Sequence, residues 1–510
     1  MRERANELKG EVRQMFDADN VMSVADMVNL VDELERLGID NHFRKEINTA
    51  LSRIHSEELD VVMSNDLHTV ALRFCLLRQH GFWVSTDVFD KFRDETGSFS
   101  KDLTGDTRGL LSLYNAAHMA VPGEATLDDA IAFARHHPEA AIGSLVSPMV
   151  EQVSRALEIA RPRFMRRLET MHYINEYDPE EAHSATLLEL ARVDLNLVRS
   201  LHLKELRTLS LWWRDLYGEV KLTYARDRIV EPYFYNFGVF HEEENSHLRI
   251  IVTKVFVLLG LMDDTYDVHA TLEECQMLDE AIQRWNESAV YFLPEYLRML
   301  YIKTLSNFNE IEDTMEPYDK YRMAYIKKTE FKSQSKNYLQ ETKWFNDKYI
   351  PSLKEHVDVT LMSTGVPLLF FVALMAAGQV VTKETFEWAF NIPDMVRASG
   401  EMGRFLNDTA SYKRGKNTRD VASTVECYMK EHGVTGEEAM VAIAAMVEQA
   451  WRRINRAYME MNCAVKPAAR WLLDMTRMLE IYYLRGRDGL TYGRDIKELV
   501  AFVFLKQIPV

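Results

Sequence analysis

The chain has 510 residues, of which 47 % are hydrophobic, and its formal charge of −17 reflects 78 acidic residues against 61 basic ones. This length exceeds one ordinary core and predicts two or three domains with large apolar interiors. The negative charge excludes nucleic acid and anionic membrane surfaces as unassisted partners. An anionic substrate stays compatible with it where arginines cluster or divalent cations bridge.

The start of the chain and its cysteines indicate a cytosolic protein. MRERANELKG has no apolar signal core and is too acidic for a transit peptide. Cys75, Cys275, Cys427 and Cys463 lack zinc spacing, and we interpret them as buried thiols of a reducing compartment. The apolar run 250–262 is interrupted by polar residues and is too short to span a bilayer. We therefore expect a cytosolic protein without a membrane span. A monomer is our expectation for the oligomeric state, which the sequence leaves open.

Apolar residues recur at helical spacing along the chain, and no strand alternation stands out. HTVALRFCLLRQHGF predicts a short helix that ends at Gly81, and TRGLLSLYNAAHMAV predicts one that stops at Pro122. LDDAIAFARHHP predicts a third helix with an acidic first turn, stopped by Pro138. The pattern predicts an all-α fold of paired helices.

A domain boundary is expected near Glu180, where Asp178-Pro179 and an acidic patch separate two helical runs. It divides the chain into an N-terminal helical domain, 1–180, and a second domain, 181–510. The first domain contains no D-x-D-D element, so acid-initiated chemistry is not expected there. We expect the active site in the second domain.

YARDRIVEPYFYN places Arg226 and Arg228 in an R-x-R pair before a proline. Two guanidinium groups at this spacing can hold phosphate oxygens through paired hydrogen bonds. Solvated surface arginines are the alternative interpretation of this pair.

The stretch LLGLMDDTYDVHA ends a very apolar segment in three aspartates. Asp263 and Asp267 are spaced i, i+4, so both carboxylates lie on one helix face, whereas Asp264 projects about 100° away and supports them. Carboxylates are disfavoured at a helix C-terminus, which implies that positive charge arrives there. Two oxygen donors on one face suit Mg²⁺ together with substrate phosphates. A solvated acidic cap is the alternative.

LMSTGVPLLFFVALMAAG is a second apolar helix with a break at 365–367. Proline interrupts the hydrogen-bond ladder and can free carbonyls such as those of Ser363 or Thr364, although a simple packing kink explains the same residues. Further on, GRFLNDTASYKRGK spaces Asn407 and Ser411 by i, i+4, with Arg404 one turn earlier. A carboxamide and a hydroxyl are both hard ligands for Mg²⁺, or else neutral surface groups.

These segments, in this order, resemble the plant class I terpene synthases, and most of all the grass sesquiterpene synthases. The resemblance covers nearly the whole chain and includes GLLSLYNAAHM, LSLWWRDL, ARDRIVEPYF, DDTYD, RFLNDTASYKR and VASTVECYMKEHGV. It implies an N-terminal α-barrel-like domain and a C-terminal class I terpenoid synthase bundle. The implied substrate is a prenyl diphosphate, ionised with three Mg²⁺ that Mn²⁺ can replace.

The resemblance assigns roles to particular residues. Asp263, Asp267, Asn407 and Ser411 match the metal ligands, and Arg226, Arg228 and Arg404 match the diphosphate-binding arginines. Tyr235 stands where the family often has tryptophan, and Tyr483 is a second aromatic candidate for stabilising a carbocation, with core packing as the alternative for each. Arg485–Gly489 resembles a lid loop, and Asp488 matches a family position near the pocket, next to which Leu490 replaces an aromatic residue. With Asp264, these form the expected catalytic and substrate-binding set.

The chain also departs from the family. Gly415 stands where the second metal motif, N-D-x-x-S-x-x-x-E, has glutamate, which predicts weaker metal affinity with activity retained. The chain starts later than family members usually do, so poorer closure of the site is expected. The absence of the tandem arginine element of cyclic monoterpene producers favours farnesyl diphosphate. A monoterpene synthase acting on geranyl diphosphate and a catalytically weakened homologue that binds prenyl diphosphates remain the alternatives.

Overall fold

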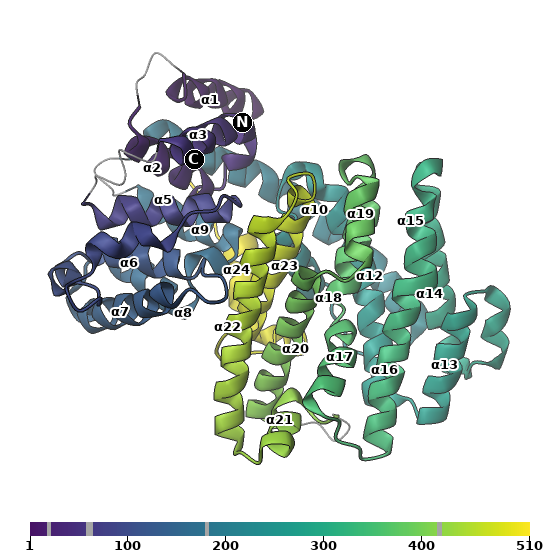
Figure 1. Cartoon of the computed structure of the whole chain (residues 1–510). Helices are drawn as coiled ribbons and strands as arrows, with labels where there is room; N and C mark the ends of the chain where they lie inside the picture. The colour runs from purple at the N-terminus through teal and green to yellow at the C-terminus, as the bar shows by residue number, and fades with distance from the viewer. Residues whose placement is uncertain (18–21, 58–64, 179–182, 416–420, 510) are drawn as a thin grey trace. The chain divides into compact units, whose positions relative to one another are not determined.

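A computed structural model describes residues 1–17, 22–57, 65–178, 183–415 and 421–509. Within these ranges the chain is helical, and its one β contact is an isolated antiparallel bridge between Arg93 and Phe99. The predicted all-α fold is therefore confirmed (Figure 1).

The described chain forms two compact units. The first contains Met1–Ser200, Asn455–Met461 and Phe502–Val510, and the second contains Leu201–Ile454 and Asn462–Ala501. The predicted boundary near Glu180 lies among residues 179–182, outside the described ones, and the division 1–180 and 181–510 stays a prediction.

The helices of the first unit surround a core rich in leucine, valine and alanine. In chain order they are α1 (Arg2–Met15), α2 (Val24–Arg36), α3 (Arg44–Ser56), α5 (Leu67–Gln79), α6 (Thr107–Ala117), α7 (Ala125–Ala141), α8 (Met149–Glu158) and α9 (Arg166–Tyr177). The division between the units falls within the long helix α10 (Ala185–Val220).

The ends of three helices test the sequence predictions. Helix α5 ends just before Gly81, whose φ of +79° turns the chain as expected. Helix α6 ends at Ala117 rather than at Pro122, because a run of tight turns already satisfies the last carbonyls. Helix α7 continues past Pro138 to Ala141, since proline holds φ near its helical value and costs the last turn only one backbone bond. The predicted stops at Pro122 and Pro138 were wrong.

The second unit contains the remaining helices, except for the C-terminal turns of two of them, from Asn455 and from Phe502 onward, which belong to the first unit. They are α11 (Val230–Val239), α12 (Ser246–Asp264), α13 (Leu272–Arg284), α14 (Glu295–Asp313), α15 (Lys320–Tyr325), α16 (Phe331–Asn346), α17 (Leu353–Ser363), α18 (Val366–Ala376), α19 (Lys383–Phe390), α20 (Asp394–Arg414), α21 (Thr424–His432), α22 (Gly436–Glu460), α23 (Lys466–Tyr483) and α24 (Lys497–Leu505). Helix α12 packs on α11 and α18, α16 packs on α17, and α20 packs on α17, α18 and α23. These seven helices frame the site described below.

Two segments, Glu243–His269 and Leu353–Ala376, are long and apolar enough to cross a bilayer by length and composition alone. Most of each segment is buried inside the structure, as core helices are. Gly365 divides the second segment at the predicted break, with a φ of +77°. The cysteines follow the prediction at three positions, while Cys463 is exposed because it lies in the turn between α22 and α23.

Candidate active site

A cavity of about 470 Å³ opens within the second unit. Its walls come from α11, α12, α16, the α17–α18 break, α20, α23 and the loop that follows α23. Every predicted site residue except Asp264 lines it, namely Arg226, Arg228, Tyr235, Asp263, Asp267, Arg404, Asn407, Ser411, Tyr483 and Asp488. Residues 150 or more positions apart in sequence thus meet at one pocket.

The aspartates lie where α12 changes its geometry. Asp263 and Asp264 end the α-helix, and Thr265–His269 form a π-helical turn that contains Asp267. Single π-helical turns often occur at functional positions, because they re-aim side chains at a helix end. One carboxylate oxygen from each aspartate lies within 4.8 Å of the other two.

The carboxyl groups of Asp263 and Asp267 have raised pKa values. Burial, and next the like charge of Asp264, raise the pKa of Asp263 to about 6. Although Asp267 is exposed at the pocket, the protein around its carboxyl and the like charge of Asp263 raise its pKa above the usual value. Hard oxygen donors this close, with too little positive charge to offset their repulsion, fit a divalent cation that would favour the ionised forms.

Asp264 has a different environment from its two neighbours. Its fully buried carboxylate accepts hydrogen bonds from the Arg226 backbone N–H (2.8 Å), the Arg226 guanidinium (2.8 Å) and Arg228 (3.0 Å). Asp264 therefore holds the R-x-R pair at the pocket and does not line the pocket itself. Because the helix turns its carboxylate toward the arginines, these contacts suit a positioning role, and the expected catalytic role of Asp264 stays a prediction.

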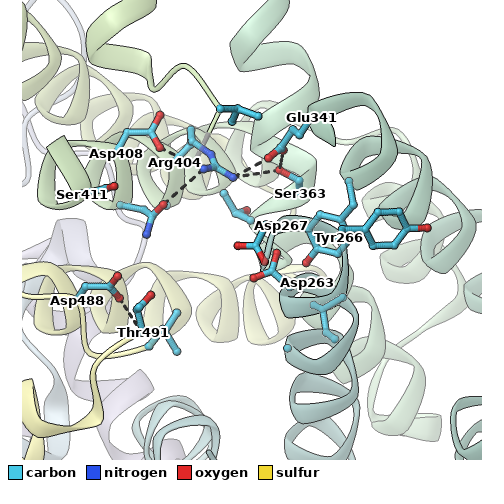
Figure 2. Close-up of a pocket in the computed structure, with 18 of the residues that line it drawn as sticks. Asp263, Tyr266, Asp267, Glu341, Ser363, Arg404, Asp408, Ser411, Asp488 and Thr491 are labelled. Carbon is cyan, nitrogen blue, oxygen red and sulfur yellow. Dashed lines mark hydrogen bonds and ion pairs between the residues drawn. The ribbon is translucent and has the colours of Figure 1, made fainter. Parts of the chain in front are cut away.

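A second set of oxygen donors lies on α20 (Figure 2). Asn407 and Ser411 line the cavity, and Asn407 Nδ2 donates to the Tyr483 hydroxyl at 3.2 Å. Figure 2 shows the Arg404 side chain reaching from this helix toward Ser363 and Glu341. The pocket thus has oxygen donors from two separate helices and a guanidinium group in its wall.

Arg404 is fixed by contacts on both sides. It donates to Asp408 at 3.1 Å and to the Ser363 hydroxyl at 3.1 Å, and lies 3.9 Å from Glu341. Asp408 in turn accepts from the Thr424 backbone N–H at 2.6 Å. Burial alone would raise the pKa of Asp408, but the charge of Arg404 and hydrogen bonds from its neighbours lower it below the usual range. This ionised carboxylate orients the arginine.

Glu341 was missed by the sequence analysis. It lies on α16, lines the pocket and accepts a hydrogen bond from Ser363. Gln334, Tyr338 and Glu341 are spaced i, i+4, i+7, so one helix face combines polar groups with an aromatic residue. The acidic residue on this mixed polar and aromatic helix face could have indicated Glu341 as a site residue.

Aromatic and loop residues form a further part of the wall. The Tyr235 hydroxyl donates to the Met475 carbonyl at 2.9 Å, so its ring rather than its hydroxyl borders the cavity. Burial raises the pKa of Tyr235 and of Tyr483, which keeps both neutral. In the loop after α23, Asp488 accepts from the Thr491 N–H at 2.9 Å.

Of the two explanations that the sequence offers for the helix break, freed carbonyls and a packing kink, the contacts favour packing. Ser363 and Thr364 line the pocket, but the Ser363 carbonyl already accepts a hydrogen bond from Gln334 at 3.0 Å. A Cβ on Gly365 would lie 2.7 Å from Leu259, so close packing also requires glycine there. Gly415 ends α20 with a φ of +86° and has open space around it.

The fold and site define an all-α, metal-binding enzyme whose pocket joins an oxygen-rich end to an aromatic wall. A family model described as the terpene synthase metal-binding domain matches residues 214–453, and one described as the terpene synthase N-terminal domain matches residues 1–157. The chain belongs to the terpene synthase family.

Relatives and solved structures agree with this membership. Eudesmanediol synthase from Zea mays is 58 % identical across 100 % of this chain and 91 % of the relative. Tau-cadinol synthase from Zea mays is 46 % identical across 100 % of this chain and 93 % of the relative. Isoprene synthase from grey poplar, solved with three Mg²⁺ ions and dimethylallyl-S-thiolodiphosphate, has a TM-score of 0.90 and 31 % identity, covering 99 % of this chain and 97 % of that chain. The protein is a class I terpene synthase that uses divalent metal, and the maize relatives indicate sesquiterpene synthase activity.

Proposed function

We propose that the protein ionises farnesyl diphosphate with Mg²⁺ and converts the carbocation to volatile sesquiterpenes, releasing diphosphate. The observation that carries the proposal is the convergence of Asp263 and Asp267 with Asn407 and Ser411 on one aromatic-walled cavity. Three Mg²⁺ are proposed with the substrate bound, and Mn²⁺ is proposed as a substitute. The bound cations would supply charge neutralisation for the leaving diphosphate.

Different residues act at the two ends of the pocket, arginines at the diphosphate end and aromatic residues at the apolar end. Arg226, Arg228 and Arg404 would bind diphosphate oxygens, and Asp264 and Asp408 would keep these arginines oriented through their ion pairs. In the apolar part, Tyr235 and Phe256 pack edge to face with ring centroids 5.5 Å apart and border the cavity. Aromatic faces stabilise a cation by roughly 0.5–2 kcal/mol each, and the apolar wall excludes water.

The proposal is tested by incubating the purified protein with farnesyl diphosphate and Mg²⁺ and analysing the volatiles by gas chromatography. We expect sesquiterpenes, their loss on chelation with EDTA, and their recovery when Mg²⁺ or Mn²⁺ is restored. Asp263→Ala should abolish them, while Asp347→Ala, which changes an exposed aspartate outside the pocket, should not. Absence of product from wild type with either metal would refute the proposal and favour a weakened diphosphate-binding homologue.

Geranyl diphosphate provides the second arm of the same assay. We expect a lower kcat/KM with this shorter substrate, because fewer of its carbon atoms contact the apolar wall. A higher kcat/KM with geranyl diphosphate would instead identify a monoterpene synthase. A cytosolic location and a monomeric state remain predictions from the sequence.

A further inference from the structure

One cation that lines the pocket, Arg414, has no role in the proposed function. It is the last residue of α20, three positions after Ser411. Gly415 follows with a positive φ, which ends the helix and turns the chain at this point. The arginine therefore stands at the edge of the site where this chain lacks the glutamate of the second metal motif.

The Arg414 guanidinium makes three contacts with the segment Leu484–Asp495, which we call the C-terminal loop. Its Nε donates to the Gly486 carbonyl at 3.1 Å. It forms an ion pair with Asp495, and it lies 4.7 Å from the centroid of the Tyr492 ring. The contacts fall at the start, near the end and at the last residue of the C-terminal loop, so one side chain bridges both ends of it.

Asp495 connects Arg414 to the part of the C-terminal loop that lines the pocket. The carboxylate oxygen paired with Arg414 also accepts a hydrogen bond from the Asp488 backbone N–H at 2.9 Å. Asp488, Leu490, Thr491 and Tyr492 all line the cavity. On the other side, Arg228 donates to the Leu490 carbonyl at 2.9 Å. The loop is thus held at one point by Arg228 and at three points by Arg414.

Direct binding of substrate is the obvious alternative role for an arginine at this edge. The contacts favour a positioning role, because the Nε and Nη2 donors of Arg414 and its planar face are already engaged by the C-terminal loop. Its side chain is 27 % exposed and that of Asp495 is 14 % exposed, so the ion pair is partly shielded from solvent. Partial shielding makes such a pair stronger than one on the open surface.

We propose that Arg414 is a positioning residue that holds the C-terminal loop against the pocket through Asp495, Gly486 and Tyr492, and thereby keeps water from the reacting cation. This inference rests on the proposed function for its consequence, but the contact itself does not depend on activity. Loosening the loop should admit water before cyclisation is complete. The expected signature is a larger share of acyclic alcohol among the products.

The first test needs no activity. Hydrogen–deuterium exchange of the substrate-free protein is measured for wild type, Arg414→Ala, Asp495→Ala and Arg494→Ala. Arg494 is the matched control, since it approaches the same acid and ring at 4.0 and 5.5 Å but is 79 % exposed. We expect Arg414→Ala and Asp495→Ala to speed exchange of the C-terminal loop about threefold to tenfold, with α18 unchanged. Unchanged loop exchange, or an equal effect of Arg494→Ala, would overturn the proposal.

The second test uses products from farnesyl diphosphate and Mg²⁺. Arg414→Ala and Asp495→Ala should each raise the ratio of acyclic alcohol to cyclic products about threefold to tenfold, with a small change in KM, and Arg414→Lys should restore part of the loss. If KM rises in Arg414→Ala while Asp495→Ala behaves like wild type, Arg414 contacts the substrate directly. That result would overturn the inference. If Arg414→Ala does not fold, Arg414→Lys and Asp495→Asn decide the question. Lack of product from wild type would refute the proposed function, whereas the exchange result would still judge the contact.

Discussion

Replacing Asp264 by asparagine separates positioning from metal binding within the aspartate cluster. Asp264→Asn keeps the shape of the side chain but removes the charge that three donors of Arg226 and Arg228 share at 2.8, 2.8 and 3.0 Å. Breaking a buried charge pair costs about 3–5 kcal/mol. The Arg226 and Arg228 side chains are 30 % and 13 % exposed, so hydration from the pocket offsets part of this cost. We therefore expect the free energy of unfolding to fall by about 2–3 kcal/mol.

The loss is measurable in two ways. For a unit of this size 1 kcal/mol corresponds to roughly 2–4 °C, so the thermal transition of the second unit should fall by about 4–12 °C. Misplaced arginines should lower kcat/KM about 100-fold. The Mg²⁺ concentration for half-maximal activity should stay within about twofold of wild type, because Asp264 faces the arginines rather than the cavity.

Asp263→Asn is the matched control, since the same substitution one residue earlier removes a cavity-lining carboxylate. It should raise the Mg²⁺ requirement at least tenfold with a smaller change in stability. The reasoning fails if Asp264→Asn shifts the Mg²⁺ requirement as much as Asp263→Asn does, or if it changes neither the transition nor kcat/KM.

Three further predictions concern the second metal motif, the Arg404 support and the first unit. Gly415→Glu should lower the Mg²⁺ concentration needed for activity, because it restores the carboxylate of the second metal motif. Gly415→Ala is its control, since both variants share the strain of a positive φ at this position. Equal metal titrations for the two variants would contradict the predicted weak site. Asp408→Asn should lower the free energy of unfolding by about 3 kcal/mol and raise KM by about tenfold, because it removes the nearer of the two acids that pair with Arg404. Urea unfolding and steady-state kinetics measure both, and an unchanged KM would refute the orienting role. Burial lowers the pKa of His68 and of His172 from 6.5 to about 4, so their stabilising contribution is present above pH 6.5 and is lost as the pH falls toward 4. Urea midpoints of the first unit should therefore fall between pH 7 and pH 4.5, less so in a variant with His68→Gln, and a midpoint independent of pH would be inconsistent with buried neutral histidines.

Local spacing in the sequence predicted the features that depend on a few neighbouring residues. Helical periodicity predicted the all-α fold, and the Gly365-Val366-Pro367 triplet predicted the break between α17 and α18. The i, i+4 spacings of Asp263 with Asp267 and of Asn407 with Ser411 predicted that each pair shares a face, and both pairs line one cavity. Such features follow from backbone geometry that the residues specify themselves.

The tertiary structure decided what depends on residues far apart in the chain. Asp264 turns to Arg226 and Arg228 across 36 or more positions, Glu341 joins the pocket from α16, and Arg414 meets a loop about 70 positions later. Each of these contacts depends on how helices pack and rotate against one another. Local periodicity does not encode that rotation, because burial against a particular neighbour sets it only once the core has formed.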